Sequence, residues 1–141
     1  MRLISWNIAR QDEPWRLLAA DDELDVALLQ EATAPPDGLD LEVVAGGEWR
    51  LAGWKDRQFS AAVVRCSSHV EVTAQPTLRP LETAGEDELA VSRPGSLAAA
   101  TVDGETLSAP IVVVSAYASW ERPPSVGEGG WIYADASAHR V

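Results

Sequence analysis

Hydrophobic and polar residues alternate near the start of the chain, over residues 2–8. Residues 2–8 place Leu3 and Asn7 on one side and Ile4 and Trp6 on the other. An alternation with a period of two predicts a β-strand, and apolar groups on both sides predict that both faces are buried.

The period then changes to that of a helix and back again. Acidic residues and Pro14 open the stretch 11–20, and Trp15, Leu18 and Ala19 fall on one helical face. Residues 26–31 form an apolar run that ends in Gln30 and Glu31. Strand, short helix and strand predict a crossover unit whose two strands are parallel neighbours in one sheet.

The rest of the chain predicts mainly strands, separated by clusters of Gly, Pro and polar residues. The expected strands are residues 49–54, 59–66, 70–74, 97–102 and 110–118. The β-branched run 111–117 predicts a central strand, and residues 79–95 predict a surface loop. Residues 119–137 predict a long Gly/Pro-rich loop, and residues 135–141 the start of a helix that the chain leaves unfinished.

Composition limits the classes of partner. The 141 residues are 46% hydrophobic and 23% charged, which is ordinary for a globular domain. No apolar run reaches the length of a membrane helix and the N-terminus is not a secretory signal, so we expect a cytoplasmic protein with no membrane partner. The net charge of −11 disfavours nonspecific nucleic-acid binding. The single cysteine, Cys66, is expected to be a buried, unreactive thiol.

Two polar side chains are expected to meet at one edge of the sheet. Asn7 ends the first strand and Glu31 ends the second, and parallel strands deliver their carboxyl ends to the same edge, where ligands of open α/β sheets bind. Carboxylate and carboxamide oxygens suit Mg²⁺. The alternative is a turn asparagine beside a solvated glutamate, and the residues alone leave both interpretations open.

Two further residues are candidates for substrate contacts. Arg10 follows Asn7 closely and either meets a phosphate or is a solvated charge. Trp120, which precedes the Gly/Pro-rich loop, either stacks on a base or sugar or packs against the core edge.

The motifs Ser5-Trp6-Asn7-Ile8 and 26–32 (Val-Ala-Leu-Leu-Gln-Glu-Ala) resemble the opening signature of the endonuclease/exonuclease/phosphatase superfamily. The later strands 59–65 and 111–117 resemble that family's order more loosely. The resemblance implies an α/β (α+β) fold, mostly β with one early crossover helix, that forms part of a four-layered α/β/β/α sandwich. It also implies hydrolysis of phosphate esters with Mg²⁺ or Mn²⁺.

Carried over by position, the resemblance makes Glu31 the metal ligand, Asn7 its neighbour in the phosphate site, and Tyr117 a hydrogen-bond donor to the scissile phosphate. For Tyr117 the alternative is a core aromatic residue. The family completes its site with an Asp-x-Asn pair and a late Asp-His, and this chain has neither. Groups to activate water and to neutralise the leaving phosphate are therefore missing.

We therefore expect residues 1–141 to be the N-terminal half of such a domain, truncated at the C-terminus. The expected function is a metal-dependent phosphodiesterase or phosphatase that is weakly active or inactive as this chain. The alternative is a non-catalytic binding module or a remnant of the fold. The substrate is left open between nucleic acid, nucleotide and small phosphoester. A half-sandwich is also expected to self-associate or to bind a missing C-terminal half.

Overall fold

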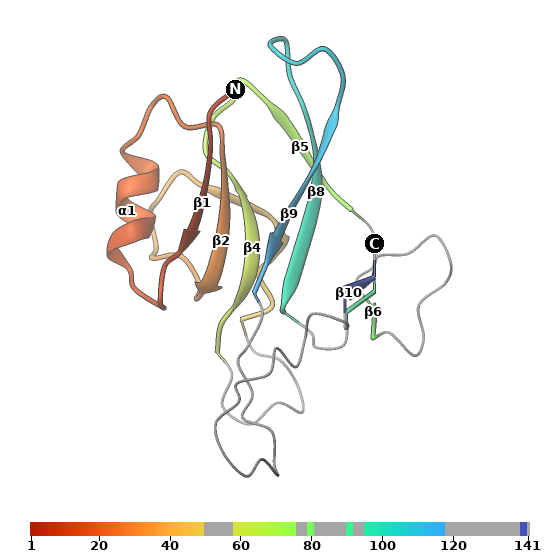
Figure 1. The fold of residues 1–141 in the computed structure, drawn as a ribbon. Helices are drawn as coiled ribbons and strands as arrows, with labels where there is room; N and C mark the ends of the chain where they lie inside the picture. The colour runs from red at the N-terminus through yellow and green to blue at the C-terminus, as the bar shows by residue number, and fades with distance from the viewer. Residues whose placement is uncertain (50–57, 76–78, 81–89, 92–94, 118–138, 141) are drawn as a thin grey trace, which may run out of the picture.

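A computed structural model describes residues 1–49, 58–75, 79–80, 90–91, 95–117 and 139–140. These residues form a mostly β structure with one short helix, which confirms the expected α+β class (Figure 1). The one helix in these ranges is too short to cross a membrane.

The first sheet contains the predicted crossover unit. Its strand order is β1-β2-β4-β3. The elements are β1 (Leu3–Asn7), α1 (Glu13–Ala19), β2 (Val26–Ala32), β3 (Glu42–Gly46) and β4 (Ser60–Arg65). Strands β1 and β2 are parallel, as predicted, with Asn7 opposite Gln30, whereas β4 runs antiparallel to both β2 and β3. Helix α1 buries Pro14, Trp15 and Leu18, which confirms the predicted apolar face at Trp15 and Leu18, whereas Ala19 at the end of the helix is exposed.

Two expectations for this sheet are wrong. Strand β1 is not buried on both faces: it lies at the edge of the sheet, where Leu3 and Asn7 are exposed and Ile4 and Trp6 are half-buried. Strand β3 was not predicted at all. Its pairing with β4 shifts register between Val43 and Ala45, and such an irregularity breaks the alternation by which strands are recognised in a sequence. The expected strand 49–54 lies almost entirely outside the described residues.

The second sheet has the order β5-β8-β9 and is antiparallel. Its strands are β5 (Glu71–Ala74), β8 (Leu97–Asp103) and β9 (Ile111–Ala116), close to their predicted bounds. The prediction that β9 is central is wrong, because β8 takes the middle position among the described strands. The β-branched run therefore leaves Val112 exposed and Val114 partly exposed instead of burying both.

A small third sheet joins β10 (His139–Arg140), β7 (Ala90–Val91) and β6 (Arg79–Pro80), in that order. The expected helix start at 135–141 is wrong at β10, because its two residues pair antiparallel with β7. The expected loop 79–95 contains β6 and β7, and its remaining residues up to 94 lie outside the described part of the chain. So does the expected loop 119–137.

The described elements stack as helix, sheet and sheet, which accounts for three of the four expected layers (Figure 1). Between α1 and the first sheet lies a cluster centred on Trp15, whose side chain is fully buried. Between the two sheets lies a second cluster of small and β-branched residues. Its buried members are Val26, Leu28, Ala45, Ala61, Val63, Val70, Ala98, Ala100, Val102 and Val113. The first sheet is thus packed on both faces, and the ends of its inner strands are held in fixed positions.

Candidate active site

The carboxyl ends of β1 and β2 bring Asn7 and Glu31 together, as the sequence predicted. The side-chain amide of Asn7 donates from Nδ2 to Glu31 Oε1 over 3.1 Å, and its Oδ1 accepts from the Ala9 amide at 3.0 Å. Because the Asn7 oxygen is engaged by the backbone, its free polar capacity is directed at the carboxylate. Asn7 therefore holds the Glu31 carboxylate in position.

The backbone at this edge is strained. Ala9, Arg10 and Glu31 have φ values of 48°, 62° and 49°, and they are the three described non-glycine residues with positive φ. Ala9 and Arg10 form the centre of a tight turn closed by the Gln11 amide on the Ile8 carbonyl at 2.9 Å. A left-handed conformation costs an L-residue about 1–2 kcal/mol, and such strain concentrates at functional sites.

Glu31 owes its conformation to an irregularity in β2. The pairing of β2 with β4 shifts register between Leu29 and Ala32, and Glu31 lies inside that interval. A bulge turns a side chain away from the direction that regular alternation would give it. The Glu31 carbonyl accepts the Arg10 amide at 2.9 Å, so the bulge and the strained turn fix each other.

The side chain of Arg10 joins the site from the strained turn. Its Nε lies 3.8 Å from Glu31 Oε2, with 60% of the arginine side chain and 20% of the glutamate side chain exposed. Its guanidinium carbon lies 5.5 Å from the centre of the Phe59 ring, a cation–π contact. The Phe59 ring in turn meets the Tyr117 ring edge-to-face, with centroids 5.7 Å apart. Asn7, Glu31, Arg10, Phe59 and Tyr117 are therefore linked in that order by successive contacts.

Phe59 was missed by sequence reasoning as a member of the site. It directly precedes β4, whose first residue, Ser60, pairs with Ala32 at the end of β2. Antiparallel pairing thus starts β4 at the same edge where β1 and β2 end. The sequence predicted this strand but not its pairing with β2. With that pairing, an aromatic residue would have been expected near Glu31.

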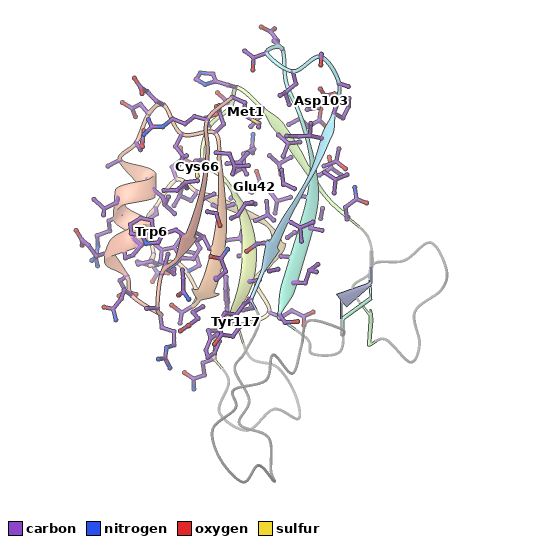
Figure 2. The ribbon with its side chains drawn as sticks, viewed as in Figure 1. Met1, Trp6, Glu42, Cys66, Asp103 and Tyr117 are labelled. Carbon is purple, nitrogen blue, oxygen red and sulfur yellow. The ribbon has the colours of Figure 1, made fainter. Side chains whose placement is uncertain are left out.

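Tyr117 is held at this edge by a brace between the two sheets. Gln30 Nε2 donates to Ser115 Oγ over 3.1 Å, and that hydroxyl donates to the Leu29 carbonyl over 2.6 Å. Ser115 is fully buried, and its bond to the Leu29 carbonyl is shielded from water, whereas the bond from Gln30 is partly buried. The Tyr117 amide also donates to the Ser96 carbonyl at 2.7 Å. Tyr117 lies at the end of β9, at the lower edge of the sheets (Figure 2).

The side chains at this edge offer one carboxylate ligand for a divalent cation. No group of three or more His, Cys, Asp or Glu side chains gathers among the described residues. Glu31 supplies one oriented, partly exposed carboxylate. Mg²⁺ is commonly held by one or two carboxylates, with water and substrate phosphate oxygens completing its shell, so this single ligand fits a magnesium site shared with substrate.

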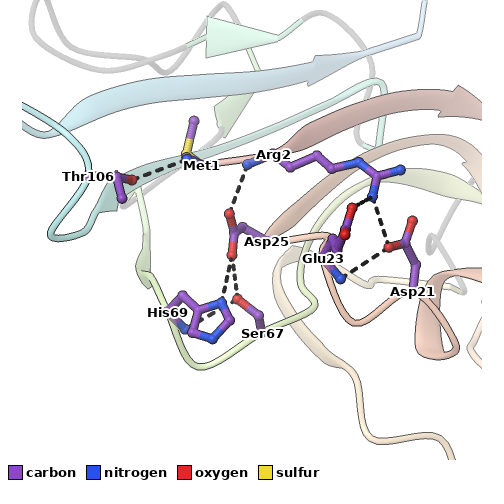
Figure 3. Close-up of polar contacts among 8 residues, drawn as sticks. All are labelled: Met1, Arg2, Asp21, Glu23, Asp25, Ser67, His69 and Thr106. Atoms are coloured by element: carbon purple, nitrogen blue, oxygen red, sulfur yellow. Dashed lines mark hydrogen bonds and ion pairs between the residues drawn. The ribbon is translucent and has the colours of Figure 1, made fainter.

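The opposite end of the first sheet holds a second polar cluster around Asp25, just before β2 (Figure 3). Asp25 is buried and accepts from the Arg2 amide at 2.8 Å and from Ser67 Oγ at 2.6 Å, with His69 Nδ1 at 3.4 Å. Burial alone would raise the pKa of Asp25, but the hydrogen bonds from Ser67 and Arg2 and the nearby N-terminal ammonium lower it below its ordinary value of 3.8.

This second cluster is a structural junction. It ties the N-terminus, the start of β2 and the turn at 67–69 together, and every described polar group facing Asp25 donates to it or carries positive charge. His69 is 73% exposed and lies at the surface of this cluster.

One predicted substrate contact, Trp120, lies outside the described residues, so its place relative to Glu31 stays a prediction. The site is therefore built from Asn7, Arg10, Glu31 and Tyr117, with Phe59 between Arg10 and Tyr117. No protein-family model, no curated protein and no solved structure matches this chain.

Proposed function

We propose that this chain is a metal-dependent phosphoester hydrolase of the endonuclease/exonuclease/phosphatase type, with Mg²⁺ or Mn²⁺ held by Glu31. One observation carries the proposal. The carboxylate that the motif resemblance designates as the metal ligand is oriented by Asn7, faced by Arg10 and set on strained backbone at the ligand-binding edge of the sheet.

Each residue has a chemical task in this proposal. Glu31 holds the cation, which polarises a phosphoryl oxygen when bound. Asn7 keeps the carboxylate in one orientation through the bond from its Nδ2. Arg10, a planar donor fork, binds the phosphate oxygens. Tyr117 donates its phenolic hydrogen to the same phosphate and is braced by Ser115 two residues earlier.

The rate is expected to be low. Within the described residues, no cluster of three or more His, Cys, Asp or Glu side chains forms at this edge, and Asp25 and His69 lie at the other end of β2. The sequence also lacks the family's Asp-x-Asn and late Asp-His motifs. Positioning and charge neutralisation remain, and these alone give partial catalysis.

The test is a phosphodiesterase assay with bis(p-nitrophenyl) phosphate and p-nitrophenyl phosphate, with Mg²⁺, with Mn²⁺ and with excess chelator. We expect slow, metal-dependent release of nitrophenol that Glu31→Gln abolishes. Glu23→Gln, which changes an exposed glutamate near the Asp25 cluster, is the matched control and should keep the activity. Hydrolysis that persists unchanged in Glu31→Gln would refute the role of Glu31.

A second candidate function is a non-catalytic binding module, favoured by the apolar surface of β9. Val112 is 62% exposed and Val114 is 36% exposed on an edge strand without charged residues. Uncharged, β-branched edges pair readily with other chains. Sedimentation at increasing concentration should show association that Val112→Lys abolishes, and a monomer at all concentrations would exclude this candidate.

A further inference from the structure

The contacts of Arg10 contain an arrangement that a simple phosphate-binding residue does not need. Its guanidinium is shared between an anion, Glu31, and an aromatic ring, Phe59, and neither contact is tight. The Nε–Oε2 separation of 3.8 Å is too long for a hydrogen bond, and the side chain is 60% exposed. The guanidinium is therefore held close to the carboxylate without being locked onto it.

The backbone confines where this guanidinium can go. Arg10 has a φ of 62°, and its amide donates to the Glu31 carbonyl at 2.9 Å, so the two residues are fastened side by side. The Phe59 ring lies 5.5 Å from the guanidinium carbon and is itself supported edge-to-face by Tyr117. An attraction to the ring does not depend on the carboxylate. Arg10 can thus leave Glu31 while it stays over the ring.

The charges of Glu31 and Arg10 suggest what this arrangement does. The Glu31 side chain is only 20% exposed, and a half-buried carboxylate needs a positive partner when no cation is bound. A divalent cation at Glu31 would repel Arg10, because both carry positive charge and seek the same carboxylate. A phosphate bound to that cation would offer the guanidinium new oxygens close by.

We propose that Arg10 is the resident counter-ion of Glu31, and that Phe59 holds its guanidinium ready to pass from the carboxylate to a substrate phosphate when a divalent cation binds. This inference rests on the proposed function, since it requires a cation at Glu31. Phe59 is a positioning residue in this scheme. Glu31 therefore has a positively charged partner both before and after the divalent cation binds.

The scheme predicts effects of opposite sign on two ligands. Arg10→Gln removes the competitor of the metal, so Mn²⁺ alone should bind more tightly, by about fivefold for one unit charge at a few ångströms in an exposed site. The same variant should bind phenylphosphonate, a non-hydrolysable phosphate analogue, about fivefold more weakly in saturating Mg²⁺. Mn²⁺ binding is measured by electron paramagnetic resonance and phenylphosphonate binding by calorimetry.

Matched variants separate this scheme from general charge or folding effects. Arg2→Gln makes the same change of charge at the start of β1, on a side chain of similar exposure, and should alter neither affinity. Phe59→Leu should shift both affinities in the directions of Arg10→Gln but less, and Phe59→Tyr, which keeps the ring, should restore them. In the Arg10→Gln background, Phe59→Leu should have no further effect.

The outcomes distinguish the inference from the proposed function. If Glu31→Gln leaves Mn²⁺ binding unchanged, the proposed function is wrong and the inference falls with it. Suppose instead that Glu31→Gln abolishes Mn²⁺ binding. If Arg10→Gln then weakens the binding of both Mn²⁺ and phenylphosphonate, or changes neither, the inference alone is overturned. An effect of Phe59→Leu that persists without Arg10 would show that Phe59 acts through packing instead.

Discussion

The strained turn after β1 makes an unusual prediction: replacing Ala9 by glycine should stabilise the protein. Ala9 is exposed and has a φ of 48°. An L-residue in this region pays about 1–2 kcal/mol that glycine does not. Glycine also lowers the free energy of unfolding by about 0.4–1 kcal/mol, because it gives the unfolded chain more conformational freedom. The net gain in the free energy of unfolding should be about 0.5–1 kcal/mol, because the exposed methyl group contributes little packing.

Urea unfolding followed by tryptophan fluorescence measures this change. The matched control is Ala19→Gly, the same substitution at an exposed residue in the last turn of α1, which should lower the free energy of unfolding by up to about 1 kcal/mol. The two variants should therefore move the midpoint in opposite directions. A loss of stability in Ala9→Gly would refute the argument that this turn stores strain. If the strain serves the site, the more stable variant should bind phenylphosphonate less tightly, because a more flexible turn no longer holds the Arg10 guanidinium over Phe59.

Three further predictions concern the scaffold. Gly46→Ala should cost at least about 3 kcal/mol, because φ is +81° and a Cβ would collide with the Ala61 carbonyl oxygen, whereas Gly38→Ala, at +82° with open space, should cost only about 1 kcal/mol in urea unfolding. Burial raises the pKa of the Cys66 thiol to about 12, so Ellman's reagent at pH 8 should react at least about tenfold more slowly with the native protein than with the unfolded chain. Asp25, whose pKa is lowered, contributes stability that is present above its ordinary value of 3.8 and lost as pH falls through the native value. Asp25→Asn should therefore be less stable at pH 7 and lose less on acidification, and an unchanged pH profile would contradict this.

The start of the fold could be predicted because its signals are local. Alternation over β1, the apolar face around Trp15 and the run that forms β2 each specify one element, and short connections leave only the parallel crossover. Asn7 and Glu31 were then expected at one edge from strand direction alone, and they are hydrogen-bonded there. Topology predicts that the two residues share an edge, whereas the hydrogen bond between them also depends on the irregularity in β2 that turns the Glu31 side chain.

The remaining features depend on pairings between distant segments, which local patterns do not encode. The edge position of β9 is set by its partner β8, and a β-branched run looks the same at an edge or in the centre. Phe59 reaches Arg10 only because β4 pairs antiparallel with β2. The positive φ of Ala9 and Arg10 has no sequence signal, since neither is Gly or Asn.

The distribution of strain itself argues for a site at this edge. Every other described residue with positive φ is a glycine, the residue that adopts this conformation without steric strain. Glycine at positions 10 and 31 would delete the guanidinium and the carboxylate, and the chain retains both side chains at a cost of about 1–2 kcal/mol each. Ala9 carries no functional group of its own, yet it lies between Asn7 and Arg10, where a stiffer residue limits the turn to one conformation. A fold that needed only stability would have no reason to keep these three residues, whereas a site that must hold Arg10 against Glu31 has one for each.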